Sequence, residues 1–366
     1  MTGPTATIDG LTAPLTVAIE RAVSLLGQAR RVLITGLTDA PLEAIAAACD
    51  LAESLGAAVD AGADDIASPA GPILLRAGGM TADLAELRDR ADLVIAWFCD
   101  SAAALATVGE AGAVAGGHRR RLVAVGPRPP TGWEHISLDA EAAVDAARLL
   151  HASLAGHEFP AGSAHVPLAT GCRTVAAAIG AATCIGILTR PGADPLGLAA
   201  WALARAVRCL AHEKPAFMVP LRLVPEGIVD NAAGAQTLLT WRYGAGGGIA
   251  RADRTGGHFR PAECDAVRLI ERGEVDAVLA VGRLPAATET AIADRASDLS
   301  LVRLDCRSDE PPCAAGSCVH VRWYRAAGTV LGQDGRERTI GDPAATIDSL
   351  AMILALLNSR LPEASA

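Results

Sequence analysis

The sequence predicts an α/β protein with two doubly wound domains. Short strands that are apolar throughout alternate with Ala-rich amphipathic stretches, which is typical of a parallel sheet covered by helices on both faces. The alternation runs in two series through 366 residues, a length that accommodates two domains of ordinary size. Apolar residues make up 51% of the chain and aromatic residues only 3%, so we expect a core of small aliphatic side chains.

The first series contains four expected strands and one well-delimited helix. The helix covers 41–56 (PLEAIAAACDLAESLG), because Pro41 suits the first turn of a helix and Gly56 suits a helix end. The strands are short apolar runs bounded by turn residues. They are expected at 31–36, 57–62, 92–98 and 121–126.

The second series follows residues 152–167, a stretch rich in Gly, Pro and His. Taken alone, this composition suggests a boundary between two consecutive domains. Beyond it, strands are expected at 185–190, 216–222, 300–306 and 318–323, helices at 195–214, 231–243 and 348–361, and a helix followed by a strand within 265–282.

Composition and charge exclude several classes of protein. The net charge of −9 argues against a nucleic-acid surface, which requires an excess of clustered cations. The uncharged stretch 174–189 is too short for a membrane span, and residues 1–10 lack the basic and apolar regions of a signal peptide. The nine cysteines are scattered, so we expect a cytoplasmic protein with reduced thiols and no membrane or nucleic-acid partner.

A glycine-rich loop at 244–248 (GAGGG) raises the question of a phosphate site. The dinucleotide fingerprint Gly-x-Gly-x-x-Gly does not fit, since its third glycine falls on Ile249 or Arg251. The loop also follows an expected helix, and a helix C-terminus repels anions. We therefore favour a helix stop at Gly244 followed by a mobile or docking loop, with a phosphate cradle as the alternative.

No catalytic or metal-binding motif stands out. Cys306, Cys313, Cys318 and His320 are close in sequence, but their spacing lacks the Cys-x-x-Cys pattern of zinc sites. Cys318 is expected to point inward from a strand as a small apolar residue. The chain lacks a Gly-x-Ser-x-Gly elbow and a P-loop, and no His-Glu pair is followed by the second histidine of a metalloprotease motif.

Three segments together resemble the B-type subunit of formylmethanofuran dehydrogenase, a member of the molybdopterin oxidoreductase superfamily. The most specific is 231–244 (NAAGAQTLLTWRYG), which Arg254 and 260–263 (RPAE) continue. The others are 71–97 (GPILLRAGGMTADLAELRDRADLVIAW) and 326–336 (AAGTVLGQDGR). The resemblance covers roughly residues 18–361.

The resemblance implies two Rossmann-like domains, one inserted in the other. On this basis the outer domain is discontinuous, and the C-terminal helix and tail follow it. The expected segments are 14–68 for the first part of the outer domain, 69–159 for the inserted domain, 160–345 for the second part and 346–366 for the helix and tail.

The metal-binding positions of the family are changed in this chain. Catalytic relatives begin with a cysteine-rich segment that ligates an iron–sulfur cluster, whereas the first cysteine here is Cys49, inside an expected helix. The family also places a Cys-His pair before the Gly-Pro at 71–72, where the cysteine ligates molybdenum or tungsten. This chain has Pro69 and Ala70 there, and neither side chain can bind a metal.

The positions near the pterin cofactor are changed as well. After the strand that ends at Trp97, the family has a Gly and then Asn-Pro, whereas Phe98, Cys99 and Asp100 follow here. A family Asp at the end of the next strand is replaced by Gly126. The resemblance therefore implies a chain that has lost its redox centre, with no bound metal, no bound cofactor and no catalytic residue.

Within the family, the sequence is similar to the B-type members of formyltransferase/hydrolase complexes of methylotrophic bacteria, which reuse the dehydrogenase architecture without redox chemistry. This similarity implies a scaffold in one-carbon metabolism whose partners are the A, C and D subunits, of which A is of the amidohydrolase type and D is a formyltransferase. Those partners would use tetrahydromethanopterin and a methanofuran analogue. The alternatives are a tungsto- or molybdopterin-dependent catalytic chain and a nucleotide-binding Rossmann enzyme.

The segment that begins at Asn231 and Gly234 lies near the pterin in complete relatives. Here we expect it to pack between domains or against a partner. Arg242, Arg251 and Arg254 are candidate contacts for a partner or for the glutamate-rich tail of the methanofuran analogue. The alternative is that these arginines form salt bridges within the fold or at an interface with another protein.

Overall fold

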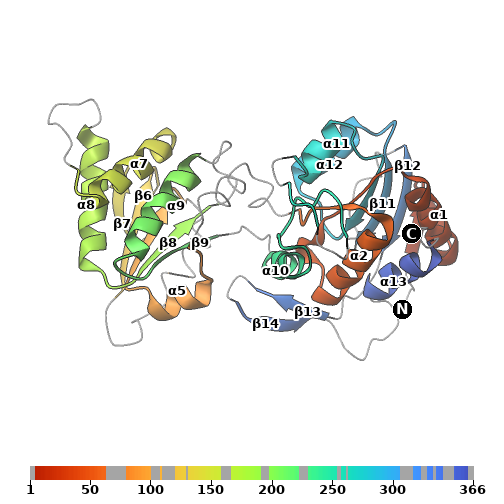
Figure 1. The fold of residues 1–366 in the computed structure, drawn as a ribbon, viewed down its shortest axis with the longest axis horizontal. Helices are drawn as coiled ribbons and strands as arrows, with labels where there is room; N and C mark the ends of the chain where they lie inside the picture. Colours follow the sequence, from red (N-terminus) through yellow and green to blue (C-terminus); the bar gives the residue numbers. More distant parts are fainter. Residues whose placement is uncertain are drawn as a thin grey trace. The chain divides into compact units, whose positions relative to one another are not determined.

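The chain forms two compact units. Unit 1 comprises Met1–Ala67, Glu226–Gly332 and Arg336–Ala366, and unit 2 comprises Ser68–Pro225 and Gln333–Gly335. The structure is a computed structural model (Figure 1). It describes residues 5–62, 80–99, 108, 120–128, 131–157, 166–190, 198–221, 230–253, 257–260, 263–305, 316–322, 328–332, 335–340 and 350–361.

Unit 1 is built on a seven-stranded sheet with the order β2-β1-β12-β11-β10-β3-β4. The strands from β12 to β4 are parallel, and β1 and β2 extend the β12 edge in antiparallel fashion. The strand bounds are β1 Thr5–Ile8, β2 Leu11–Ala13, β3 Val32–Thr35, β4 Ala58–Val59, β10 Ala277–Val281, β11 Ser300–Asp305 and β12 Ser317–Arg322.

Helices cover both faces of this sheet. Leu279 of β10 belongs to the apolar cluster that includes α1, α2 and α13, and the next residue towards the N-terminus, Val278, belongs to the cluster with α11 and α12. The helices of unit 1 are α1 Leu15–Gln28, η1 Leu37–Asp39, α2 Leu42–Leu55, α10 Ala232–Tyr243, α11 Ala266–Glu271, α12 Ala286–Asp294 and α13 Leu350–Arg360, and a hairpin of β13 Gly328–Leu331 and β14 Glu337–Ile340 completes the unit.

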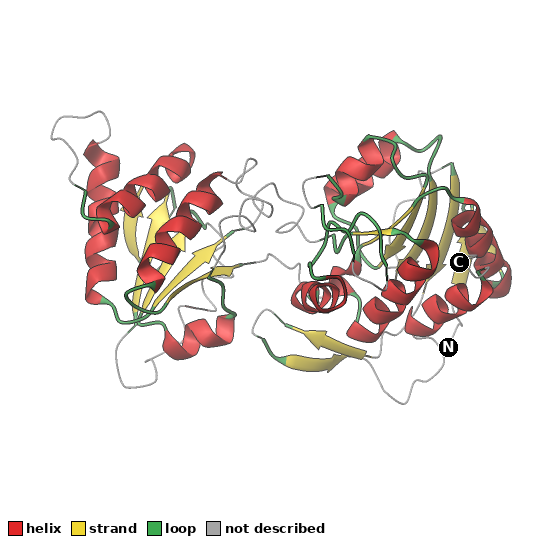
Figure 2. Ribbon diagram, in the orientation of Figure 1, coloured by secondary structure: helices red, strands yellow, loops and turns green. Residues whose placement is uncertain are grey.

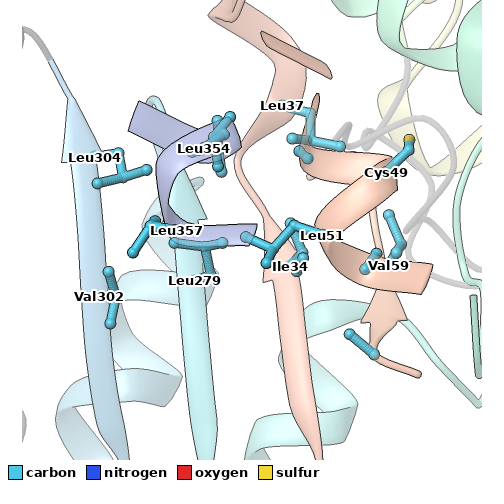
Figure 3. Close-up of a cluster of buried hydrophobic side chains, with 14 of the residues drawn as sticks. Ile34, Leu37, Cys49, Leu51, Val59, Leu279, Val302, Leu304, Leu354 and Leu357 are labelled. Carbon is cyan, nitrogen blue, oxygen red and sulfur yellow. The ribbon is translucent and has the colours of Figure 1, made fainter. Parts of the chain in front are cut away.

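The core of unit 1 is aliphatic, as its composition predicts. Figure 3 shows side chains of β3, β10 and β11 meeting those of α2 and α13 in one buried cluster. Ile34, Leu279 and Leu357 are fully buried there. At about 25 cal/mol per Å² of apolar surface, such burial is the main source of stability for the fold.

Unit 2 contains a five-stranded parallel sheet with the order β7-β6-β5-β8-β9 (Figure 2). Its faces are again covered separately, one by α7, α8 and α9 and the other by α5. The bounds are β5 Leu93–Trp97, β6 Arg121–Gly126, β7 Glu134–Ser137, β8 Ile185–Thr189, β9 Ala216–Pro220, α5 Leu84–Arg90, η2 Ala140–Ala142, α7 Ala143–Leu154, α8 Val166–Ala181 and α9 Leu198–Ala211. The predicted α/β class with doubly wound sheets is confirmed.

The predicted boundary at 159/160 is wrong. β8 pairs with β5 along its length, and β9 pairs with β8, so the segment up to β9 belongs to unit 2. The Gly/Pro/His-rich stretch 152–167 includes the end of α7 at Leu154 and the start of α8 at Val166, and both helices contribute to the same core. Composition alone did not show that both sides of this stretch belong to one unit.

Local sequence signals position several helices. α2 starts after Pro41, and Gly56 ends it in the left-handed conformation with φ of 58° while donating its amide to Ala52 O. Asp83 and Asp265 cap α5 and α11 by accepting backbone N–H bonds three residues on. Within the described segments, no helix combines the length and apolarity needed to cross a bilayer.

Candidate functional site

Phe98 lies directly after β5, where the strand order of the second sheet reverses. β6 flanks β5 on one side and β8 on the other. The carboxyl ends of strands at such a reversal are the usual ligand site of an open α/β sheet. The Phe98 amide donates a 2.8 Å hydrogen bond to Val125 O, which ties this residue to β6.

The Phe98 side chain covers this end of the sheet. Its half-buried ring meets the Trp97 ring edge-on, with centroids 5.6 Å apart. A Cβ added to Gly126 would lie 3.5 Å from Phe98 Cδ1, so the ring also lies over the end of β6. A ligand that needs close approach to the backbone at this strand end would meet the Phe98 ring.

The backbone of Phe98 adopts the left-handed conformation, with φ of 48°. Glycine adopts this conformation freely, whereas a residue with a Cβ is destabilised by about 1–2 kcal/mol. The strain coincides with the position where the resemblance places a family glycine. Position 98 therefore combines a backbone conformation suited to glycine with an aromatic side chain.

A pair of substitutions separates ring packing from backbone strain. Phe98→Ala and Phe98→Gly both delete the ring, but only glycine relieves the left-handed strain. We expect Phe98→Ala to lower the free energy of unfolding by about 1–3 kcal/mol, and Phe98→Gly to be about 1 kcal/mol more stable than Phe98→Ala. Urea denaturation measures both, and equal stabilities of the two variants would contradict a strained backbone.

The carbonyl oxygen of Gly126 is engaged within the fold. It lies 2.8 Å from His135 Nε2 and accepts the Leu138 amide over 3.3 Å. The Gly126 backbone has φ of 138°, a conformation that side chains rarely adopt. This strand end is thus closed by contacts of β7 and its following turn.

Asn231 connects three segments of unit 1. Its Nδ2 donates to Ala40 O over 2.6 Å, its Oδ1 accepts the Leu331 amide over 2.7 Å, and its own amide donates to Thr38 O over 2.7 Å. The residue is fully buried. Asn231 therefore joins the start of α10 to the η1–α2 turn and to β13.

Gly234 allows the close packing that this connection requires. A Cβ at this position would overlap Asn231 Oδ1 and lie 2.9 Å from Leu42 Cδ2. Any larger residue must displace the Asn231 amide or α2. The contacts of Asn231 and Gly234 within unit 1 give these two residues a structural role, and the expected contact with a partner stays a prediction.

Arg242 forms salt bridges with α2. Its guanidinium lies 2.5 Å from Asp50 Oδ1 and 2.5 Å from Glu53 Oε1. The hydrogen bond that Arg242 donates to the nearly buried Glu53 carboxylate raises the pKa of Arg242. Arg251 is exposed, and a Cβ on Gly56, at the C-terminus of α2, would lie 3.3 Å from its Nε. Contact of either arginine with an acidic ligand stays a prediction.

The glycine-rich loop docks onto β4. Gly244 ends α10 with φ of 79° and donates to Thr240 O, as predicted for a helix stop. Ile249 then bridges Val59 of β4, and the buried Asp60 carboxylate accepts the Gly248 amide over 3.4 Å. The loop thus packs against the sheet, which is the docking alternative of the sequence prediction.

Asp60 is a buried carboxyl that no sequence motif marks. Its other oxygen accepts the Ala266 amide at the start of α11 over 3.1 Å. Burial raises the pKa of Asp60 to about 6, and the nearby Asp265 carboxylate adds to the effect. In the sequence, the one feature that points to Asp60 is its position directly after the short strand β4.

Several predicted residues lie outside the described residues: Pro69, Ala70, Asp100 and Arg254. Among the cysteine cluster, Cys318 is buried on β12 as expected, but it is disulfide-bonded, so the expectation of a reduced thiol is wrong there. The described part of the chain holds no group of three or more His, Cys, Asp or Glu side chains arranged for a metal ion.

The fold is similar to that of a chain in the X-ray crystal structure of the formyltransferase/hydrolase complex (FhcABCD) from Methylorubrum extorquens in complex with methylofuran. The TM-score is 0.78 and 22% of residues are identical, with 97% of this chain and 98% of that chain covered. No protein-family model matches the sequence, and no curated protein matches it. The likeness establishes a shared fold along nearly the whole chain.

Proposed function

We propose that this chain is a non-catalytic, B-type member of a formyltransferase/hydrolase complex. In this role it docks in the cytoplasm with the A, C and D subunits, of which A is of the amidohydrolase type and D is a formyltransferase. The complex would convert formyl-tetrahydromethanopterin to formate through a methanofuran analogue. The observation that carries the proposal is the likeness of fold to a chain of such a complex over 97% of the sequence.

The end of β5 supports a role without redox chemistry. Phe98 covers the strand end where a dinucleotide cofactor would approach the backbone, and it does so in a conformation suited to glycine. Pro69 and Ala70 stand where the resemblance places a metal-ligating Cys-His pair. Both changes remove parts of one cofactor site, which argues against a tungsto- or molybdopterin enzyme.

The role is tested by purifying the complex from its own host through a tag on this chain. We expect the other three subunits to co-purify, and we expect no stoichiometric tungsten, molybdenum or iron on this chain by elemental analysis. One tungsten or molybdenum per chain would instead support the redox alternative. Thermal stabilisation of the chain by NAD or ATP would support the nucleotide-binding alternative.

Trp241 offers a way to test docking between subunits directly. This indole on α10 is 90% exposed, and exposed Trp side chains dominate many protein interfaces. We expect Trp241→Ala to weaken retention of at least one partner protein in the pull-down by tenfold or more, equivalent to about 1.4 kcal/mol. Thr240→Ala, the exposed neighbour on the same helix, is the control. Equal retention by both variants would exclude this face as a contact between subunits.

A further inference from the structure

Helices α7 and α9 bring a thiol and an imidazole together on unit 2. The Cys209 Sγ lies 3.5 Å from His151 Nε2. Cys209 is exposed and His151 is half-buried, so the pair is reachable from solvent on the thiol side. A cysteine with a base at this distance has the arrangement of an activated nucleophile.

A cation stands beside the pair. Arg205 lies one turn before Cys209 on α9, and its guanidinium lies over the Trp201 ring at 5.4 Å from the centroid. Contact with an aromatic face holds a guanidinium in place. A fixed positive charge at this place attracts an anionic reagent.

The imidazole is suited to accept the thiol proton. Burial lowers the pKa of His151, and the positive charges of Arg205 and His157 lower it further. The ring is therefore neutral at physiological pH, and Nε2 has a free lone pair when the proton is on Nδ1. The Cys209 proton can then move to Nε2 as the thiolate forms.

The other free cysteines among the described residues lie in a different environment. Cys49, Cys99, Cys172, Cys184 and Cys264 are all buried. Burial raises the pKa of the Cys49 and Cys172 thiols to about 11, which keeps them protonated and unreactive. Cys209 is the described free cysteine that combines exposure with a base and a cation.

We propose that Cys209 and His151 form a covalent modification site for small anionic disulfides. The Cys209 thiolate attacks one sulfur of the disulfide, a new S–S bond forms, and the old S–S bond breaks. The leaving thiolate takes the proton that His151 accepted from Cys209, so the products are a mixed disulfide on Cys209 and one free small thiol. Arg205 attracts the negative charge of the reagent, and Trp201 offers an adjacent apolar face. The inference does not depend on the proposed function.

The site is tested with 5,5′-dithiobis(2-nitrobenzoate), an anionic disulfide whose released thiolate is coloured. We expect the native full-length chain to show one fast phase, at least tenfold faster than free cysteine at pH 7. Cys209→Ser should abolish that phase, which separates it from reaction at any other cysteine. Cystamine, a cationic disulfide, should modify Cys209 more slowly, as mass spectrometry of the intact chain would show.

Two histidine variants distinguish the role of His151 as proton acceptor from a general effect of removing a histidine. His151→Gln should slow the fast phase at least tenfold, whereas His212→Gln, at an exposed histidine directly after α9, should change it less than twofold. The rate in the unmodified chain, relative to free cysteine at the same pH, is a result that does not depend on how a variant folds. A rate equal to that of free cysteine would overturn the proposal.

Discussion

Asn231→Ala is expected to lower the free energy of unfolding by about 2–4 kcal/mol, because each buried polar group left without its partner costs about 1–3 kcal/mol. The change removes the bond from Nδ2 to Ala40 O and the bond from the Leu331 amide to Oδ1. Urea denaturation measures the loss. Thr237→Ala, on the exposed face of α10, is the control and should change stability by less than about 0.5 kcal/mol.

Asn231→Ala is also expected to change hydrogen exchange locally. The Leu331 amide loses its acceptor, so its hydrogen exchange should become faster in Asn231→Ala while exchange in β5 of unit 2 stays unchanged. Unchanged exchange at Leu331, together with a stability loss below about 0.5 kcal/mol, would show that Asn231 does not hold β13.

Gly234→Ala should act through the same contact. The new methyl group displaces Asn231 Oδ1, so the single variant should lose stability in a similar way. In the double variant with Asn231→Ala, the displaced atom is already gone. The combined loss should therefore be smaller than the sum of the single losses, which is the signature of coupled residues in a double-mutant cycle.

The role of Asn231 illustrates what the sequence could not predict. Local signals at Pro41 and Gly56 delimited α2 correctly because capping depends on neighbours in the chain. The partners of Asn231 lie 191 and 100 residues away, at Ala40 and Leu331. Such pairings depend on how distant segments pack, and residue types alone do not encode them.

The edges of the sheets show the same limit. β1 pairs with β12, whose residues are more than 300 positions away, and no strand was predicted at Thr5–Ile8. The interior strands β3, β5 and β10 were predicted because a strand buried on both faces is apolar along its length. Phe98 was correctly singled out as a bulky residue at a strand end, but its left-handed backbone became visible only in the structure.

Asp60 leads to a prediction about pH. Burial raises its pKa to about 6 in the folded chain, compared with an ordinary aspartate value of 3.8. A raised pKa means that the folded state binds the proton more tightly than the unfolded state. The resulting stabilisation is fully present below about pH 4 and is lost as the pH rises towards 6 and above.

The expected result is a pH-dependent difference between the natural chain and Asp60→Asn. Between pH 7 and pH 4 the natural chain should gain up to about 3 kcal/mol relative to the variant, since a shift of one pKa unit corresponds to about 1.4 kcal/mol. Carboxyls with lowered pKa values, such as Asp92 and Asp276, have the opposite pH dependence, but they are present in both chains and cancel in the difference.

The stability difference between the natural chain and Asp60→Asn depends on Asp265 as well as on Asp60. Burial also raises the pKa of Asp265, and the Asp265 carboxylate disfavours ionisation of Asp60. Removing the Asp60 charge therefore shifts Asp265 as well, and the measured window describes the pair. Urea denaturation at pH 4, 5, 6 and 7 gives the profile. A stability difference that is constant over this range would mean that Asp60 is ionised throughout, because its bonds to the Gly248 and Ala266 amides would then outweigh the effect of burial.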